Sequence, residues 1–159
     1  MEIREATKDD MSKVLELIQE LATFEKEPDA VAIDLAELED NLVADPPTFK
    51  CFVALIEGKI QGCAICYTRF STWKGKTVHL EDLIVTRTYR GRGLGKALYN
   101  KVLSYARNLN VRRVEWVVLD WNKNAIEFYE KSGAVMIKNW YLAQMDQASL
   151  NNYLTDEGI

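Results

Sequence analysis

The first third of the chain has the hydrophobic pattern of a short strand followed by two helices. Residues 3–6 suit an edge strand, and apolar residues recur at helical intervals over 11–22. Thr7 and Asp10 stand before that helix in the arrangement of a capping box, in which each residue satisfies a backbone group of the other. Asp34 can cap a second, leucine-rich helix.

The middle of the chain has the pattern of strands. Two apolar runs, residues 51–56 and 60–70, are joined by a glycine turn and therefore predict a β-hairpin. A third long strand is expected over 77–85. Apolar residues on one face predict a helix over 96–110, and the almost continuous apolar run at 113–119 is typical of a central strand.

The last part of the chain predicts two helices separated by two strands. A short helix over 122–132 is closed by a glycine, strands are expected near 134–138 and 140–145, and a final helix is expected near 149–154. This order of strands and helices predicts a mixed α/β fold, of the α+β kind, whose first half is largely antiparallel.

Length and composition suit one globular domain, residues 1–159, because 48% of the residues are hydrophobic and no linker or repeat interrupts the pattern. The formal charge of -4 argues against general binding of nucleic acid, which favours basic chains. No apolar run approaches the length of a membrane span, and the N-terminus lacks the pattern of a signal peptide. We therefore expect a cytoplasmic protein.

The cysteines and the single histidine do not favour a metal site. Cys63 and Cys66 have the spacing of half a zinc site, but they fall in a predicted strand, where residues three apart point to opposite faces. We therefore expect buried thiols and no bound metal.

A glycine-rich stretch with four cationic side chains, residues 87–96, lies between a predicted strand and a predicted helix. Glycines allow a ligand to approach the backbone, and the start of a helix offers free N–H groups to an anion, so this stretch suits a phosphate or pyrophosphate. It lacks the spacing of a Walker A loop and of the dinucleotide fingerprint. The spacing that it has is Arg90-x-x-Gly93-x-Gly95. A flexible glycine turn with solvated charges is the alternative interpretation.

This spacing resembles the acetyl-CoA pyrophosphate loop of the GCN5-related N-acetyltransferase (GNAT) superfamily. The order of strands and helices is also similar to that of the superfamily, so the resemblance covers nearly the whole chain. It implies a GNAT fold, with a central twisted mixed sheet of about six to seven strands flanked by helices. Four stretches are similar to its spermidine/spermine branch, which also contains diamine and thialysine acetyltransferases: Leu21–Glu25, His79–Val85, Tyr89–Gly95 and Trp121–Tyr129.

The resemblance further implies which residues bind acetyl-CoA, the co-substrate. The backbone of a strand end is expected to pair with the pantetheine amides, the loop to hold the pyrophosphate, and two residues near the next helix to line the cofactor. In chain order these residues are Leu83, Ile84, Val85, Arg90, Gly91, Arg92, Gly93, Leu94, Gly95, Lys96, Asn122 and Ala125.

Glu81 and Tyr129 are the expected catalytic residues. A primary amine with a pKa of ~10.4 is protonated at neutral pH, so it must lose a proton before it attacks the thioester, and the departing thiolate is best protonated by an acid. By resemblance, Glu81 attracts and deprotonates the amine, and Tyr129 is the general acid. A solvated strand carboxylate and a core aromatic are the alternatives. On a regular strand, Glu81 and Asp82 point to opposite faces and cannot share a cleft without a bulge.

The resemblance places the acceptor beside Phe24 and Glu25, together with Glu81 and Asp82. It implies direct transfer of acetyl to a primary amine of a small cationic acceptor, first of all a diamine or polyamine. A thialysine or amino-acid acceptor, a protein lysine or N-terminus, and a CoA-binding regulatory module without turnover are the alternatives. Relatives in this branch are commonly homodimers, so a homodimer is expected, whereas nucleic acid and membranes are not expected as partners.

Overall fold

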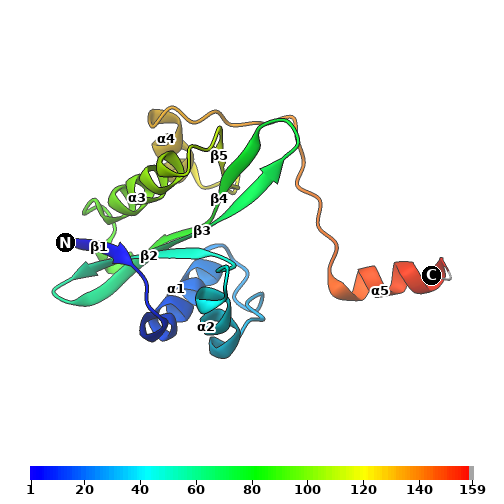
Figure 1. Cartoon of the computed structure of the whole chain (residues 1–159), viewed down its shortest axis with the longest axis horizontal. Coiled ribbons are helices and arrows are strands. Elements are labelled where there is room, and N and C mark those ends of the chain that lie inside the picture. Colours follow the sequence, from blue (N-terminus) through cyan, green and yellow to red (C-terminus); the bar gives the residue numbers. More distant parts are fainter. Residues whose placement is uncertain (158–159) are drawn as a thin grey trace. The chain divides into compact units, whose positions relative to one another are not determined.

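A five-stranded sheet organises the protein, of which the computed structural model describes residues 1–157 (Figure 1). The elements up to residue 117 are the strands β1 (Glu2–Glu5), β2 (Lys50–Ile56), β3 (Lys59–Ser71), β4 (Gly75–Val85) and β5 (Val114–Glu115), the helices α1 (Met11–Phe24), α2 (Leu35–Val43) and α3 (Leu94–Asn108), and the short 3-10 turns η1 (Lys8–Asp10) and η2 (Arg87–Tyr89).

The strands lie in the sheet in the order of the chain, β1-β2-β3-β4-β5. The first four are antiparallel neighbours, and β5 pairs in parallel with β4. The β2–β3 hairpin has a two-residue loop, Glu57 and Gly58, with φ of 50° and 74°, as a type I′ turn requires. The predicted edge strand, hairpin and third long strand are confirmed.

The expectation of six to seven strands is wrong, because two predicted stretches do not form strands. β5 takes up two residues of the apolar run at 113–119, and residues 134–138 and 140–145 form no strand. An apolar run becomes a strand where a neighbour supplies hydrogen-bond partners. Residues 118–157 contain no strand to pair with, and both Val135 and Tyr141 remain exposed.

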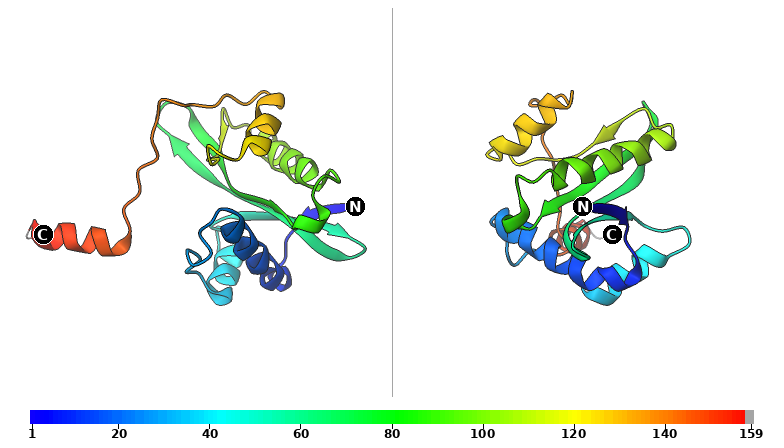
Figure 2. Two further views of the ribbon diagram at one scale, coloured as in Figure 1. Left: turned by 180° about the vertical axis from the view of Figure 1, so that it is seen from behind. Right: turned by 90° about the vertical axis from the view of Figure 1, so that its left-hand side faces the viewer.

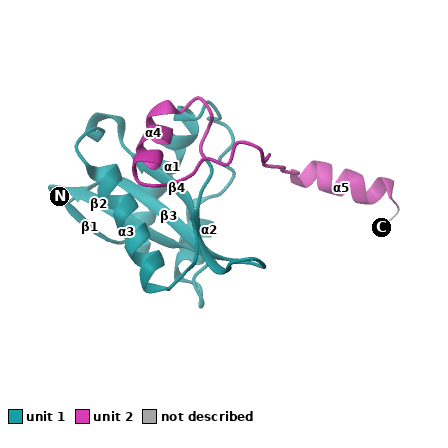
Figure 3. Cartoon of the chain, turned by 90° about the horizontal axis from the view of Figure 1, so that it is seen from above, with its two compact units in different colours: residues 1–117 teal, residues 118–159 magenta. Residues whose placement is uncertain are grey.

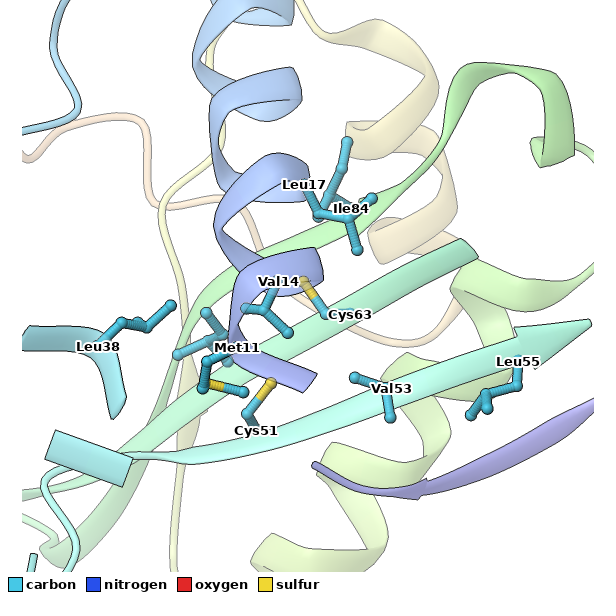
Figure 4. Packing of buried hydrophobic residues seen from close by; sticks show 10 residues of the cluster. Met11, Val14, Leu17, Leu38, Cys51, Val53, Leu55, Cys63 and Ile84 are labelled. Carbon is cyan, nitrogen blue, oxygen red and sulfur yellow. The ribbon is translucent and has the colours of Figure 1, made fainter. Parts of the chain in front are cut away.

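Helices cover both faces of the sheet. α1 and α2 lie on one face and α3 lies on the other (Figures 1 and 2). α1 turns Met11, Val14 and Leu17 toward the sheet, at the spacing of one helical face. They pack against a cluster of strand and helix residues, which includes Leu38, Cys51, Val53, Leu55, Cys63, Ile65 and Ile84 (Figure 4). This cluster fixes α1 against the strands from which the candidate site is built.

The chain divides into two compact units, residues 1–117 and 118–159 (Figure 3). The second unit contains α4 (Lys123–Lys131) and α5 (Gln147–Asp156), close to the predicted helices. The Asn122 side chain accepts a hydrogen bond from Ala125 N at 3.4 Å and so caps α4, while Asp146 caps α5 through Ser149 N at 2.7 Å. No helix within residues 1–157 is long and apolar enough to cross a membrane.

Candidate active site

The predicted phosphate loop has the backbone of an anion-binding turn. Gly91 and Gly93 have φ of 74° and 85°, a region that side chains disfavour, and α3 begins directly after Gly93. The first bond of the helix runs from Ala97 N to Gly93 O at 3.0 Å. The N–H groups of the preceding first turn therefore have no acceptor within the helix and can face an anion.

Arg90 is bound to the protein itself rather than extended over this loop. Its Nε donates to Val85 O at 2.9 Å, its Nη2 lies 3.9 Å from Glu20 Oε1, and its guanidinium lies 4.8 Å from the centre of the Phe24 ring. Glu20 Oε1 also accepts from Arg87 N at 2.8 Å. Arg90 thus ties the loop to the end of β4 and to α1, the helix that ends at Phe24.

Strand β4 contains a bulge at Glu81. Ile65 of β3 pairs with Asp82, whereas the next residue, Cys66, pairs with Leu80. Glu81 is therefore the extra residue, without a partner across the ladder. This is the irregularity that two neighbouring carboxylates need if they are to share a cleft.

The bulge brings both carboxylates to the face of the sheet that α1 covers. Ile65 and Tyr67 lie on that face of β3, so their partners Asp82 and His79 lie on the same face of β4. Tyr67 Oη donates to Glu81 Oε2 at 2.8 Å, which draws Glu81 to this side as well. His79 Nε2 lies 3.5 Å from the same oxygen.

The charges of two acidic side chains act on a third here. Burial raises the pKa of Asp82 to about 6, and the charges of Glu81 and Glu25 add to this effect. Burial also raises the pKa of Glu25, which directly follows α1. Neighbouring negative charges that are partly shielded from water repel one another, and a bound cation would reduce this repulsion. The predicted acceptor residues Glu25, Glu81 and Asp82 thus form an acidic group within the first unit.

The strand end named by the resemblance offers its backbone rather than its side chains. Ile84 and Val85 are buried, so their side chains serve the core. The pairing of β5 with β4 stops at His79, opposite Glu115. The edge of β4 from Leu80 onward therefore lies beyond this ladder, where an extended chain of amides could add as a further strand.

The other predicted residues belong to the second unit. Tyr129 lies on α4, buried, with its ring centre 5.3 Å from that of Phe128. Asn122 caps the same helix by accepting from Ala125 N. Residues 1–157 contain no group of three or more His, Cys, Asp or Glu side chains that could hold a metal ion.

Two residues near Glu81, Tyr67 and His79, were not among the predicted site residues. Burial raises the pKa of Tyr67 to about 12, aided by its hydrogen bond to Glu81, so the hydroxyl stays a donor at all ordinary pH values. The only sequence signal for a contact between these residues and Glu81 was that Tyr67 and His79 lie on adjacent predicted strands. That signal requires the pairing register, which local pattern does not give.

Residues 11–134 match the model of the acetyltransferase (GNAT) family. The chain is 34% identical to the thialysine N-epsilon-acetyltransferase of Caenorhabditis elegans over 155 residues, covering 96% of each chain. It is 30% identical to the human spermidine/spermine N(1)-acetyltransferase-like protein 1 over 98% of its own length, which spans 24% of that longer protein.

Solved structures agree with the fold. An integron cassette protein of V. cholerae superposes with a TM-score of 0.77 at 22% identity, covering 96% of each chain. An aminoglycoside N-acetyltransferase solved in complex with CoA superposes with a TM-score of 0.72 at 21% identity, covering 91% of this chain and 99% of that one. The chain therefore belongs to the acetyltransferase (GNAT) family and is an acetyl-CoA-dependent N-acetyltransferase.

Proposed function

We propose that the enzyme transfers acetyl to a primary amine of a small cationic acceptor, a diamine or polyamine. The observation that carries this proposal is the acidic group of Glu25, Glu81 and Asp82 in the first unit. A second positive charge on the acceptor gives it an additional attraction to this group, which a monoamine lacks. The name of the human relative agrees with a polyamine acceptor.

A lysine analogue is the second candidate acceptor. Thialysine acetyltransferases from Caenorhabditis elegans and Bos taurus are 34% and 38% identical to this chain over most of its length. Such an acceptor carries a carboxylate beside its α-amine, which the same acidic group would repel. The acidic group therefore favours the diamine, and the names of the Caenorhabditis elegans and Bos taurus relatives favour the lysine analogue.

The proposed reaction needs one base and one acid. Glu81 takes a proton from the ammonium, directly or through water, and the neutral amine attacks the carbonyl carbon of the thioester. The carbon–sulfur bond breaks, and Tyr129 donates its proton to the departing thiolate of CoA. The acetylated nitrogen then loses its extra proton, which returns through water to the Tyr129 phenolate. No acyl-enzyme is proposed, since all three cysteines are buried and burial raises their pKa above the ordinary value.

Acetyl-CoA is proposed to bind along the edge of β4 and at the start of α3. The backbone of Leu83–Val85 would pair with the pantetheine amides, and the loop Arg90–Lys96 would hold the pyrophosphate through its N–H groups. Since Arg90 is engaged with Val85 and Glu20, the cationic side chains near the phosphates would be Arg92 and Lys96. Asn122 and Ala125 would line the cofactor.

We also propose that the two compact units form one acetyltransferase domain, since the family match at residues 11–134 runs across both. The homodimer and the cytoplasmic location remain part of the proposal. Light scattering of the purified protein tests the first, and fractionation of cells tests the second.

An acceptor panel with Glu81→Gln tests the proposal. Release of the CoA thiol is followed with putrescine, spermidine, spermine, thialysine, lysine, a primary monoamine and a histone-tail peptide. We expect the highest kcat/KM for a diamine or polyamine, and a loss of about 10²–10⁴-fold in Glu81→Gln. Glu57→Gln, in the β2–β3 turn, is the matched control and should act like wild type.

The outcomes separate the alternatives. Acetylation of the peptide alone would replace the proposal with a protein acetyltransferase, and preference for thialysine would favour the second acceptor. Acetyl-CoA binding without turnover of any acceptor would favour a regulatory module. Equal losses in Glu81→Gln for diamines and monoamines would leave Glu81 without a role in recognising the second charge and would undercut the polyamine acceptor.

A further inference from the structure

We propose that His79 is a positioning residue that holds the carboxylate of Glu81, and that Arg69 fixes the imidazole in the tautomer needed for this. The inference rests on the proposed role of Glu81 as the carboxylate that receives the acceptor amine. His79 is the one histidine of the chain, and no predicted role included it.

The contact with Arg69 determines where the imidazole proton lies. Arg69 Nη1 lies 3.2 Å from His79 Nδ1. A guanidinium can donate but cannot accept, so Nδ1 must be the accepting nitrogen, and a neutral ring then carries its proton on Nε2. Nε2 is the nitrogen that faces Glu81, 3.5 Å from Oε2.

A second carboxylate holds Arg69 in place for this contact. Arg69 Nη1 lies 3.0 Å from Glu115 Oε1, and Arg113 Nε lies 2.9 Å from the other oxygen of Glu115. In the sheet, Tyr67 pairs with His79 and His79 pairs with Glu115. The contacts therefore run directly across three strands, at the place where β5 joins the sheet.

These contacts hold one oxygen of Glu81 and leave the other for a ligand. Tyr67 Oη and His79 Nε2 both approach Oε2, and no residue between 1 and 157 has a hydrogen bond to Oε1. The Glu81 side chain is 50% exposed, whereas that of His79 is 12% exposed. One oxygen of the carboxylate is thus contacted by the partly buried Tyr67 and His79, while the other can receive an ammonium.

A neutral imidazole serves this purpose better than a cation would. Burial lowers the pKa of His79, and the charge of Arg69 lowers it further, while Glu81 and Glu115 act in the opposite direction. At neutral pH the ring therefore turns an N–H toward Glu81, at the 3.5 Å contact, without cancelling the negative charge that attracts the acceptor. A lysine or arginine at this position would form an ion pair with Glu81 and compete with the substrate.

A double-mutant cycle on the full chain tests this inference. His79→Phe keeps a planar ring against Tyr67, whose ring centre is 5.3 Å away, but removes both nitrogens. We expect kcat/KM for the best diamine to fall about tenfold, with an unchanged Kd for acetyl-CoA. In the Glu81→Gln background the same substitution should cause no further loss, because there is no carboxylate left to hold.

Two more variants make the cycle specific. His79→Gln keeps an N–H donor and cannot become charged, so it should recover most of the activity lost in His79→Phe, also where the latter folds poorly. Arg69→Met removes the contact that fixes the tautomer and should lower kcat/KM only when His79 is present. Lys76→Gln, on the exposed side of β4, is the control and should match wild type.

Equal losses from His79→Phe in both backgrounds would overturn the inference, as would full activity of His79→Phe or failure of His79→Gln to recover activity. Full activity of Glu81→Gln would overturn the assignment of Glu81, and this inference with it. That result is distinct from the others, because it is read in the Glu81 variant alone.

Discussion

Asp82 links charge, stability and pH at the scale of a single residue. Its pKa lies at about 6 instead of 3.8, so between these values the folded state holds a proton that the unfolded chain has lost. The free energy of unfolding must therefore fall as the pH rises from about 4 to about 6, and the stability is fully present only below that window.

Asp82→Asn should remove this pH dependence. The amide keeps the shape of the carboxylic acid but cannot ionise, so we expect the free energy of unfolding at pH 7 to rise by about 1–3 kcal/mol. Urea unfolding of both proteins from pH 4 to pH 7 measures this difference in the free energy of unfolding. The same variant should bind a diamine more weakly, and parallel stability curves for variant and wild type would contradict the expectation.

Tyr129→Phe separates acid catalysis from packing at the same scale. The ring of Tyr129 is buried beside Phe128 and should keep its place without the hydroxyl. If Tyr129 protonates the thiolate, kcat should fall by about 10²–10⁴-fold while the Kd for acetyl-CoA changes little. Tyr105→Phe, on α3, is the control. Unchanged kcat with chemistry as the slow step would make Tyr129 a core aromatic.

Sequence alone indicated much of the candidate site, but not its geometry. Glu81 and the glycine loop were recognisable because the motif preserves residue types at fixed spacing. The relation of Glu81 to Asp82 was not, because one inserted residue reverses the alternation of side chains, and that bulge depends on how β4 pairs with β3. Tyr67 and His79 were not predicted as site residues, because their contacts with Glu81 also depend on how β4 pairs with β3.

At the scale of elements, a single carboxylate joins β1, η1 and α1. Asp10 accepts from Arg4 Nη1 and Nη2 at 2.6 and 2.9 Å and from Thr7 N at 2.7 Å, which also confirms the predicted capping contact. The hydrogen bond from Arg4, more than the competing effect of burial, lowers the pKa of Asp10 to about 2.

Asp10→Ala should therefore weaken the attachment of β1 to the start of α1. We expect the free energy of unfolding at pH 7 to fall by about 2 kcal/mol, since charged hydrogen bonds are lost and Arg4 is left unpaired. In wild type this stabilisation should be complete above about pH 4 and disappear toward pH 2. Lys13→Ala, which breaks an exposed pair with Glu16, should cost no more than about 0.5 kcal/mol.

The start of α3 is the second element with a testable role. Gly93→Val places a branched side chain at a φ of 85° beside the proposed pyrophosphate site, so acetyl-CoA should bind at least about tenfold more weakly. Gly58→Val, at a φ of 74° in the β2–β3 turn, imposes similar backbone strain away from the site. Equal affinities in the two variants, measured by calorimetry, would argue against phosphate binding at this loop.

At the scale of the whole molecule, local pattern predicted helices better than strands. The capped helices α2, α4 and α5 follow from nearby residues such as Asp34, which accepts from Glu37 N at 2.8 Å. Strands depend on partners that are distant in sequence, so residues 134–145 had the composition of strands without forming them. The sequence has no linker-like stretch that would have predicted the division after residue 117.

The buried thiols have a practical consequence for the whole protein. Cys51, Cys63 and Cys66 should be silent toward a thiol reagent in the native state and react only after denaturation, which a titration with and without guanidinium measures. The colour formed in a native reaction mixture would then report released CoA alone, without an enzyme background. One cysteine introduced on the surface would likewise be the single labelling site, with the natural three left in place.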